Sequence, residues 1–151
     1  MIEAMTVSSH SANTYLRTRV LTASREELRL LLIEGAIKFA MQAREGLAAR
    51  NFEQVFSGTE NARNILVELI TTIKDEPDPE LAAKVRSLYT FFYIRLNEAS
   101  FEKDASKFDE VIGLLEYERE TWILLMQKLA SEGDGAEIEP QGSGGPFSVE
   151  G

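Results

Sequence analysis

The fold is decided by residues 24–49, which read SREELRLLLIEGAIKFAMQAREGLAA. Apolar residues recur in this stretch three or four positions apart, which is the spacing of an α-helix. Ser24 and Glu27 match a capping box, in which the hydroxyl accepts from the third helical amide and the carboxylate accepts from the amide of Ser24. The stretch therefore predicts a long helix from Arg25 to about Ala49.

Three more helices follow this one along the chain. The apolar spacing predicts them over residues 52–74, 79–100 and 105–130. Asn51 and Asp104 can cap the first and the last of them. Residues 75–79, DEPDP, separate the first two, because proline interrupts a helix interior but suits the first turn of the next helix behind an Asp78 cap. Short connections favour antiparallel neighbours. The sequence predicts an all-α fold: an antiparallel up-down bundle of four long helices plus a short N-terminal helix or arm.

Composition divides the chain into three parts. Residues 1–14 are small and polar without periodicity, which predicts a mobile N-terminal arm. Residues 132–151 are rich in glycine and carry only acidic charges, a composition that predicts a disordered tail. Residues 15–131 then form the single helical domain that a chain of 151 residues favours.

Charge and hydropathy exclude several classes of partner. The formal net charge of -9 disfavours nucleic acid. No apolar run reaches the roughly 18 residues that a membrane span needs, so we expect no membrane insertion. The sequence has no cysteine, and its N-terminus lacks a signal-peptide pattern. These features favour a cytoplasmic location.

Catalytic and metal-binding patterns are absent from the sequence. His10 is the only histidine, so paired Glu-x-x-His motifs and histidine-dependent triads are excluded. The lack of cysteine excludes thiolate metal sites, and no glycine-rich phosphate loop occurs. The sequence predicts no catalytic residue, no metal and no cofactor, and therefore a protein that is not an enzyme.

Two of the predicted helices carry more apolar residues than one core-facing stripe requires. The surplus residues are Leu30, Ile33, Ile37 and Met41 on the first long helix and Phe91 and Ile94 on the third. One interpretation is internal: a helix made from residues 13–21, or a deep position in the bundle, covers them. The other is a surface groove for the apolar face of a partner helix. Tyr15, in a polar segment, is a candidate for docking onto such a groove.

A family resemblance extends over about residues 13–128. The residues that carry it are 15–24, Leu28, 33–39, 87–89, Arg95, Leu96, Ala99, Asp104, 110–115, Arg119 and Trp122. In order and spacing they resemble the FliS family, the export chaperones of flagellin.

The resemblance implies a helical bundle that binds the disordered C-terminal segment of flagellin in the cytoplasm. It further implies that binding prevents premature polymerisation and presents flagellin to the flagellar type III export gate. The family's N-terminal segment, with its tyrosine, is linked to groove occupancy and to export-gate contact, and this role would pass to Tyr15 and Val20. The six surplus apolar residues are then the expected client contacts.

The chain departs from the family pattern at a few positions. It has Ile33-Glu34 where the family usually has Tyr-Asp, Thr90 for Asp, Ile94 for Arg and Ser100 for Asn. An isoleucine in place of arginine predicts recognition that depends less on charge. Two other functions stay open on the sequence: an adaptor that binds a regulator of flagellar assembly or transcription through the same groove, and a structural homo-oligomer whose surplus stripes cover each other.

Overall fold

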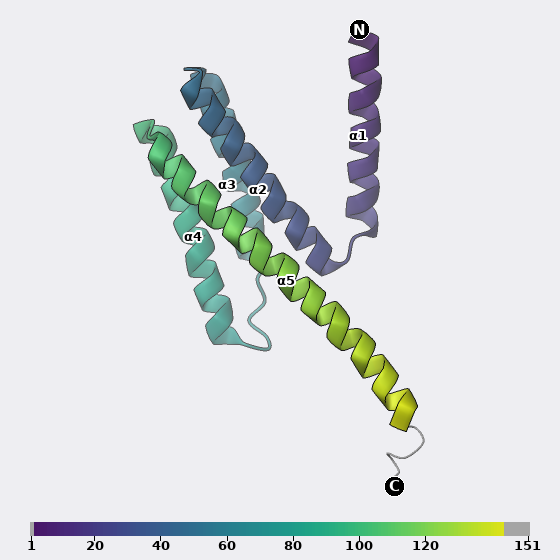
Figure 1. Ribbon diagram of the computed structural model, residues 1–151. Helices are drawn as coiled ribbons and strands as arrows, with labels where there is room; N and C mark the ends of the chain where they lie inside the picture. The colour runs from purple at the N-terminus through teal and green to yellow at the C-terminus, as the bar shows by residue number, and fades with distance from the viewer. Residues whose placement is uncertain (1, 144–151) are drawn as a thin grey trace.

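The computed structural model describes residues 2–143, with side chains over residues 11–132, and this part of the chain contains only helices and no strand. The five helices of that part are α1 (Ile2–Thr22), α2 (Arg25–Ala48), α3 (Phe52–Thr71), α4 (Pro79–Glu102) and α5 (Ala105–Ser143) (Figure 1). The all-α prediction is confirmed.

The helix starts follow from the capping residues identified in the sequence. Ser24 accepts from the Glu27 amide at 3.1 Å, and the Glu27 carboxylate accepts from the Ser24 amide at 2.8 Å, so the capping box is formed. Asn51 caps α3, and Asp78 caps α4 by accepting from the Leu81 amide at 3.1 Å. These caps satisfy amides that have no partner within the helix.

Helices α2 to α5 enclose the hydrophobic core. α2 packs against α3 and α5, and α4 packs against the same two helices, so each of the four has two neighbours. Figure 1 shows the chain reversing direction between successive helices of this group. The largest fully buried side chains are Ile33, Leu66, Leu69, Tyr89, Phe92, Leu96, Phe108, Val111 and Leu115.

The α2–α3 pair packs closely because glycine lies at the crossing. A Cβ atom on Gly58 would be 2.8 Å from both the Ala43 nitrogen and the Phe39 oxygen, which are backbone atoms of α2. A Cβ on Gly35 would be 3.0 Å from Ile65 Cδ1 of α3. A larger residue at Gly58 would force the two helices apart, whereas at Gly35 the end of the Ile65 side chain would have to shift.

The two ends of the group α2–α5 differ in how the chain connects. At one end the α2–α3 and α4–α5 turns contain Arg50 (φ 58) and Lys103 (φ 55), both left-handed. Both cations lie over the Phe52 ring, at 5.6 and 5.3 Å from its centroid. The opposite end carries the longer α3–α4 loop, residues 72–78, and the short link from α1.

The expected part boundaries do not coincide with breaks in the helices. α1 is continuous across residue 14, where the predicted arm ends. α5 continues past residue 132, where the predicted tail begins. Glycine lowers helix stability by only about 1 kcal/mol per residue, so Gly133 did not mark the end of α5. Residue 1 and residues 144–151, which include the last part of the expected tail, lie outside the described residues.

Helix α1 does not cover the group α2–α5. All its described side chains, from Ser11 to Thr22, are exposed, and Figure 1 shows α1 standing away from the other helices. A helix over residues 13–21 therefore exists, but the internal cover proposed for it in the sequence analysis is not what the structure shows.

Candidate functional site

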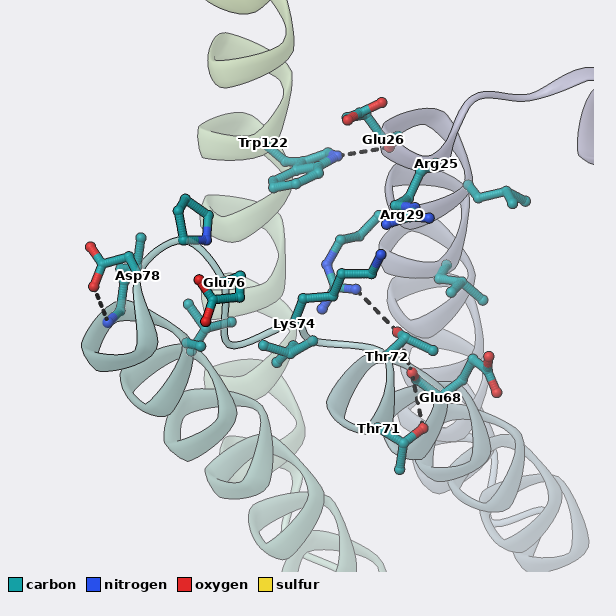
Figure 2. A pocket seen from close by; sticks show the side chains of 17 residues that line it. Arg25, Glu26, Arg29, Glu68, Thr71, Thr72, Lys74, Glu76, Asp78 and Trp122 are labelled. Atoms are coloured by element: carbon teal, nitrogen blue, oxygen red, sulfur yellow. Dashed lines mark hydrogen bonds between the residues drawn. The ribbon is translucent and has the colours of Figure 1, made fainter.

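A cavity of about 720 Å³ opens at the end of the bundle that carries the α3–α4 loop. We call it the end cavity; the start of α2, the end of α3, the loop, the start of α4 and one residue of α5 line it (Figure 2). Its apolar lining residues are Leu28, Leu32, Ile73, Pro77, Leu81, Ala82, Val85 and Trp122. Leu81 is 56% exposed, so apolar surface is open to solvent here.

Trp122 forms one wall of the end cavity and is fixed by a long-range hydrogen bond. Its indole Nε1 donates to the Glu26 carbonyl at 2.9 Å, joining α5 to the first turn of α2 (Figure 2). The indole N–H is satisfied in this way while the ring face remains available for apolar contact. The bond lies two residues from Ser24, where the link from α1 ends.

Arg29 connects three elements beside the end cavity. Its guanidinium donates to the Leu69 carbonyl at 2.8 Å and to the Thr72 hydroxyl at 3.2 Å, which holds the end of α3 against α2. It also lies 5.7 Å from the centroid of the Tyr89 ring. The Tyr89 hydroxyl donates to the Glu118 carboxylate at 2.8 Å. Burial and the negative charge of Glu118 raise the pKa of Tyr89 above its ordinary value.

The α3–α4 loop is held in place by α4. Arg86 donates to the Ile73 carbonyl at 3.2 Å and forms an ion pair with Asp75. Asp78 closes the loop by capping α4, as Figure 2 shows. The loop therefore forms a fixed wall for the cavity although it has no regular structure.

The structure places two of the six expected client contacts in the core. Ile33 is 0% exposed and Ile37 is 5% exposed, so the expectation that they lie on a free surface is wrong. The physical reason is that α2 packs against both α3 and α5, which buries two of its sides. Leu30 is half-buried, and Met41 is 41% exposed.

The other two expected contacts, Phe91 and Ile94, lie together on α4. With Arg86, Ser87 and Thr90 they line a shallow hollow of about 380 Å³. Ile94 is half exposed, and Phe91 is half-buried beneath the Arg95 guanidinium, 5.0 Å from its ring centroid. The hollow includes no residue of α2, so the structure does not bring Met41 and Ile94 into one groove.

Tyr15 and Val20 are both exposed on α1. The Arg19 guanidinium lies 6.0 Å from the Tyr15 ring centroid, a contact within α1 itself. Because α1 joins α2 through residues 23–24, beside the end cavity, both residues belong to the segment that leads into this site.

The end cavity was not predicted from the sequence. Leu28, Leu81, Val85 and Trp122 have the helical spacing of core residues, but they lie at helix ends where no further partner covers them. The length of the DEPDP connection was the available signal, since a longer loop leaves the helix ends on either side less tightly joined.

The described part of the chain has neither a membrane-spanning helix nor a group of metal-binding side chains. No helix there is long and apolar enough to cross a membrane. In the same residues, no group of three or more histidine, cysteine, aspartate or glutamate side chains is placed to hold a metal ion.

Comparisons with known proteins agree with the resemblance seen in the sequence. The family model described as "Flagellar protein FliS" matches residues 8–129. The chain is 30% identical over 131 residues to the flagellar secretion chaperone FliS of Bacillus subtilis (strain 168), covering 87% of this chain and 92% of that protein. It is 27% identical over 110 residues to the protein of the same name from Campylobacter jejuni, covering 73% of this chain and 86% of that one. The chain therefore belongs to the flagellar protein FliS family, a family of chaperones and not of enzymes.

Proposed function

We propose that the protein is a cytoplasmic export chaperone that binds the disordered C-terminal segment of flagellin, prevents its premature polymerisation and delivers it to the flagellar type III export gate. The observation that carries this proposal is the family match over residues 8–129, together with two relatives named flagellar secretion chaperones. The helical fold and the open apolar cavity support it.

The proposed scaffold is the antiparallel up-down bundle of α2 to α5. The ring of helix contacts and the direction of the helices in Figure 1 support this arrangement. A scaffold of this kind leaves helix ends and outer faces available for a segment that folds as it binds. Such coupled folding costs ordering free energy, which keeps affinity moderate and allows release.

The proposed client contacts follow from exposure. The end cavity offers Leu81 and Trp122, and the hollow on α4 offers Phe91 and Ile94. Leu30 and Met41 of α2 complete the set by their partial exposure, whereas the buried Ile33 and Ile37 are not included. An amphipathic client helix fits such sites by placing apolar residues into them at helical spacing.

The proposed role of α1 is contact with the export gate, with Tyr15 and Val20 as its contact residues. Their exposure and the position of α1 outside the core support this assignment. A helix that buries none of its described side chains can change partner without disturbing the bundle.

The test is a titration of the protein with a synthetic C-terminal flagellin segment from the same organism. Calorimetry measures the affinity, and circular dichroism measures the gain of helix. We expect saturable one-to-one binding with a gain of helix. Leu81→Glu, in the end cavity, is expected to weaken binding at least tenfold, whereas Phe101→Glu, at an 88% exposed position outside both hollows, is expected to leave it unchanged.

Two further measurements, light scattering and capture of partners from cells, separate the two rival functions. A stable dimer in light scattering that is unaffected by the flagellin segment would favour the homo-oligomer, whose contact surface could include Leu124, Leu125 and Leu129, exposed on α5. Absence of flagellin binding, with a regulator as the stoichiometric partner captured from flagellated cells, would favour the adaptor.

A further inference from the structure

The end cavity has its positive charges on one side. Arg25 and Arg29 come from the start of α2 and Lys74 from the α3–α4 loop, and all three line the cavity. Figure 2 shows Lys74 extending toward the two arginines on the α2 side. Glu76 and Asp78 line the opposite side, on the loop and at the start of α4, and Glu26 of α2 and Glu68 of α3 line the cavity on the side of the cations. The cations are therefore gathered on one side of the cavity, whereas carboxylates line both sides.

These three cations lack a carboxylate partner in the part of the chain that the structure describes. No ion pair there involves Arg25, Arg29 or Lys74, whereas the nearby Arg86 of α4 is paired with Asp75. The formal net charge of the chain is -9, so acidic side chains are not scarce. The positive side of the cavity thus remains open to an external anion.

Arg29 is the cation for which the lack of a carboxylate partner matters most. It is half-buried, and its hydrogen bonds go to the neutral oxygens of Leu69 and Thr72. A guanidinium that is partly removed from water without a counterion interacts strongly with an incoming carboxylate, because screening by solvent is reduced. None of the four carboxylates that line the cavity forms an ion pair with Arg29, and Asp78 is occupied in capping α4.

We infer that the end cavity recognises a client helix in which an acidic side chain lies beside the apolar stripe. The apolar residues of the client fill the space between Leu28, Leu81 and Trp122, and its carboxylate faces Arg25, Arg29 and Lys74. This inference rests on the proposed function, because it specifies which part of the flagellin segment the cavity takes. Rim charges of this kind give orientation and specificity to a contact whose bulk is apolar.

The test compares three peptides: the flagellin C-terminal segment, the same segment with every Asp and Glu changed to Asn and Gln, and the unchanged segment with an amidated C-terminus. Each is titrated calorimetrically against the full-length protein and against the double variant Arg25→Gln/Lys74→Gln. Both residues are exposed, so the double variant is expected to fold. Lys84→Gln, an exposed lysine of α4 outside the cavity, is the matched control.

We expect side-chain neutralisation of the peptide to weaken binding about five- to tenfold, and the double variant to weaken binding of the unchanged peptide by a similar factor. The two changes together are expected to cost little more than either alone, and higher salt is expected to reduce the difference. Lys84→Gln should bind like the original protein.

Two results overturn the inference while leaving the proposed function intact. The first is equal affinity for the unchanged and the neutralised peptides. The second is weaker binding of the amidated peptide but not of the neutralised one. That result would mean that the cations contact the C-terminal carboxylate of the peptide and not an acidic side chain. Failure of all three peptides to bind would instead overturn the proposed function, and the inference with it.

Discussion

The indole of Trp122 donates to the carbonyl of Glu26 across 2.9 Å, joining two residues that are 96 positions apart in the chain. This bond connects α5, at a side chain that packs against the core, to the first turn of α2. It therefore holds together the end of the bundle at which the cavity opens and to which α1 is attached.

Trp122→Phe is expected to lower the free energy of unfolding by about 1–2 kcal/mol, since it removes one hydrogen bond and part of a half-buried ring. Urea denaturation followed by circular dichroism measures this. Tyr117→Phe, at an exposed position of the same helix, provides the control and should change nothing. A stability equal to that of the original protein would show that the Glu26 contact does not restrain the end of the bundle.

The raised pKa of Tyr89 makes stability depend on pH in the alkaline range. Above the ordinary value of 10.0 the unfolded chain loses this proton while the folded protein keeps it. Stability is therefore expected to be fully present below pH 10 and to fall above it, by up to about 1.4 kcal/mol per pH unit. Tyr89→Phe should flatten this dependence, as measured by urea midpoints between pH 9 and 11. An unchanged slope in the variant would contradict the assignment.

Gly58→Ala is expected to destabilise the protein by about 1–3 kcal/mol, because the new Cβ would lie 2.8 Å from two backbone atoms of α2. Gly113→Ala is the matched control on α5. No atom lies within 4 Å of a Cβ there, so the higher helix propensity of alanine should stabilise the protein by up to about 1 kcal/mol. Thermal melts of the two variants should move in opposite directions; a Gly58→Ala protein that melts at the original temperature would disprove the close crossing.

Ile37→Asp is expected to unfold the protein or lower its stability by more than 3 kcal/mol, since it places a carboxylate in the core. Ile94→Asp, at a half-exposed position, should keep the original helix content and melting temperature and reduce only client binding. Circular dichroism and peptide titration together separate these effects. A well-folded Ile37→Asp protein would place Ile37 on the surface after all.

Removal of residues 1–22 is expected to leave the melting temperature of the bundle unchanged within about 3 °C, because the described side chains of α1 are exposed. The truncation keeps Ser24 and therefore the cap of α2. Binding to the export gate is expected to be lost. A marked drop in melting temperature would mean that α1 packs on the bundle in solution.

Local signals in the sequence predicted the helices well. Ser24, Asn51 and Asp78 each cap the helix that the sequence assigned to them, because capping depends on residues within one turn. The end of α5 was not predicted, because Gly133 only weakens a helix and does not terminate it without a competing structure.

The site was predicted less well, since it depends on which helices become neighbours. Spacing showed that α2 has two apolar faces, but both a central position in a bundle and a free groove produce that pattern. The structure shows that the face with Ile33 and Ile37 is covered by packing. The end cavity depends on the path of the loop at residues 72–78, and no local pattern specifies that path.

The turns at Arg50 and Lys103, whose side chains both lie over the Phe52 ring, are joined to each other at one end of the bundle. Helix tips at the opposite end are joined by a longer chain segment and depend on side-chain contacts such as those of Trp122 with Glu26 and of Arg86 with Asp75. Client binding in the end cavity is thus expected to change amide exchange rates most around residues 72–78 and least beside Phe52.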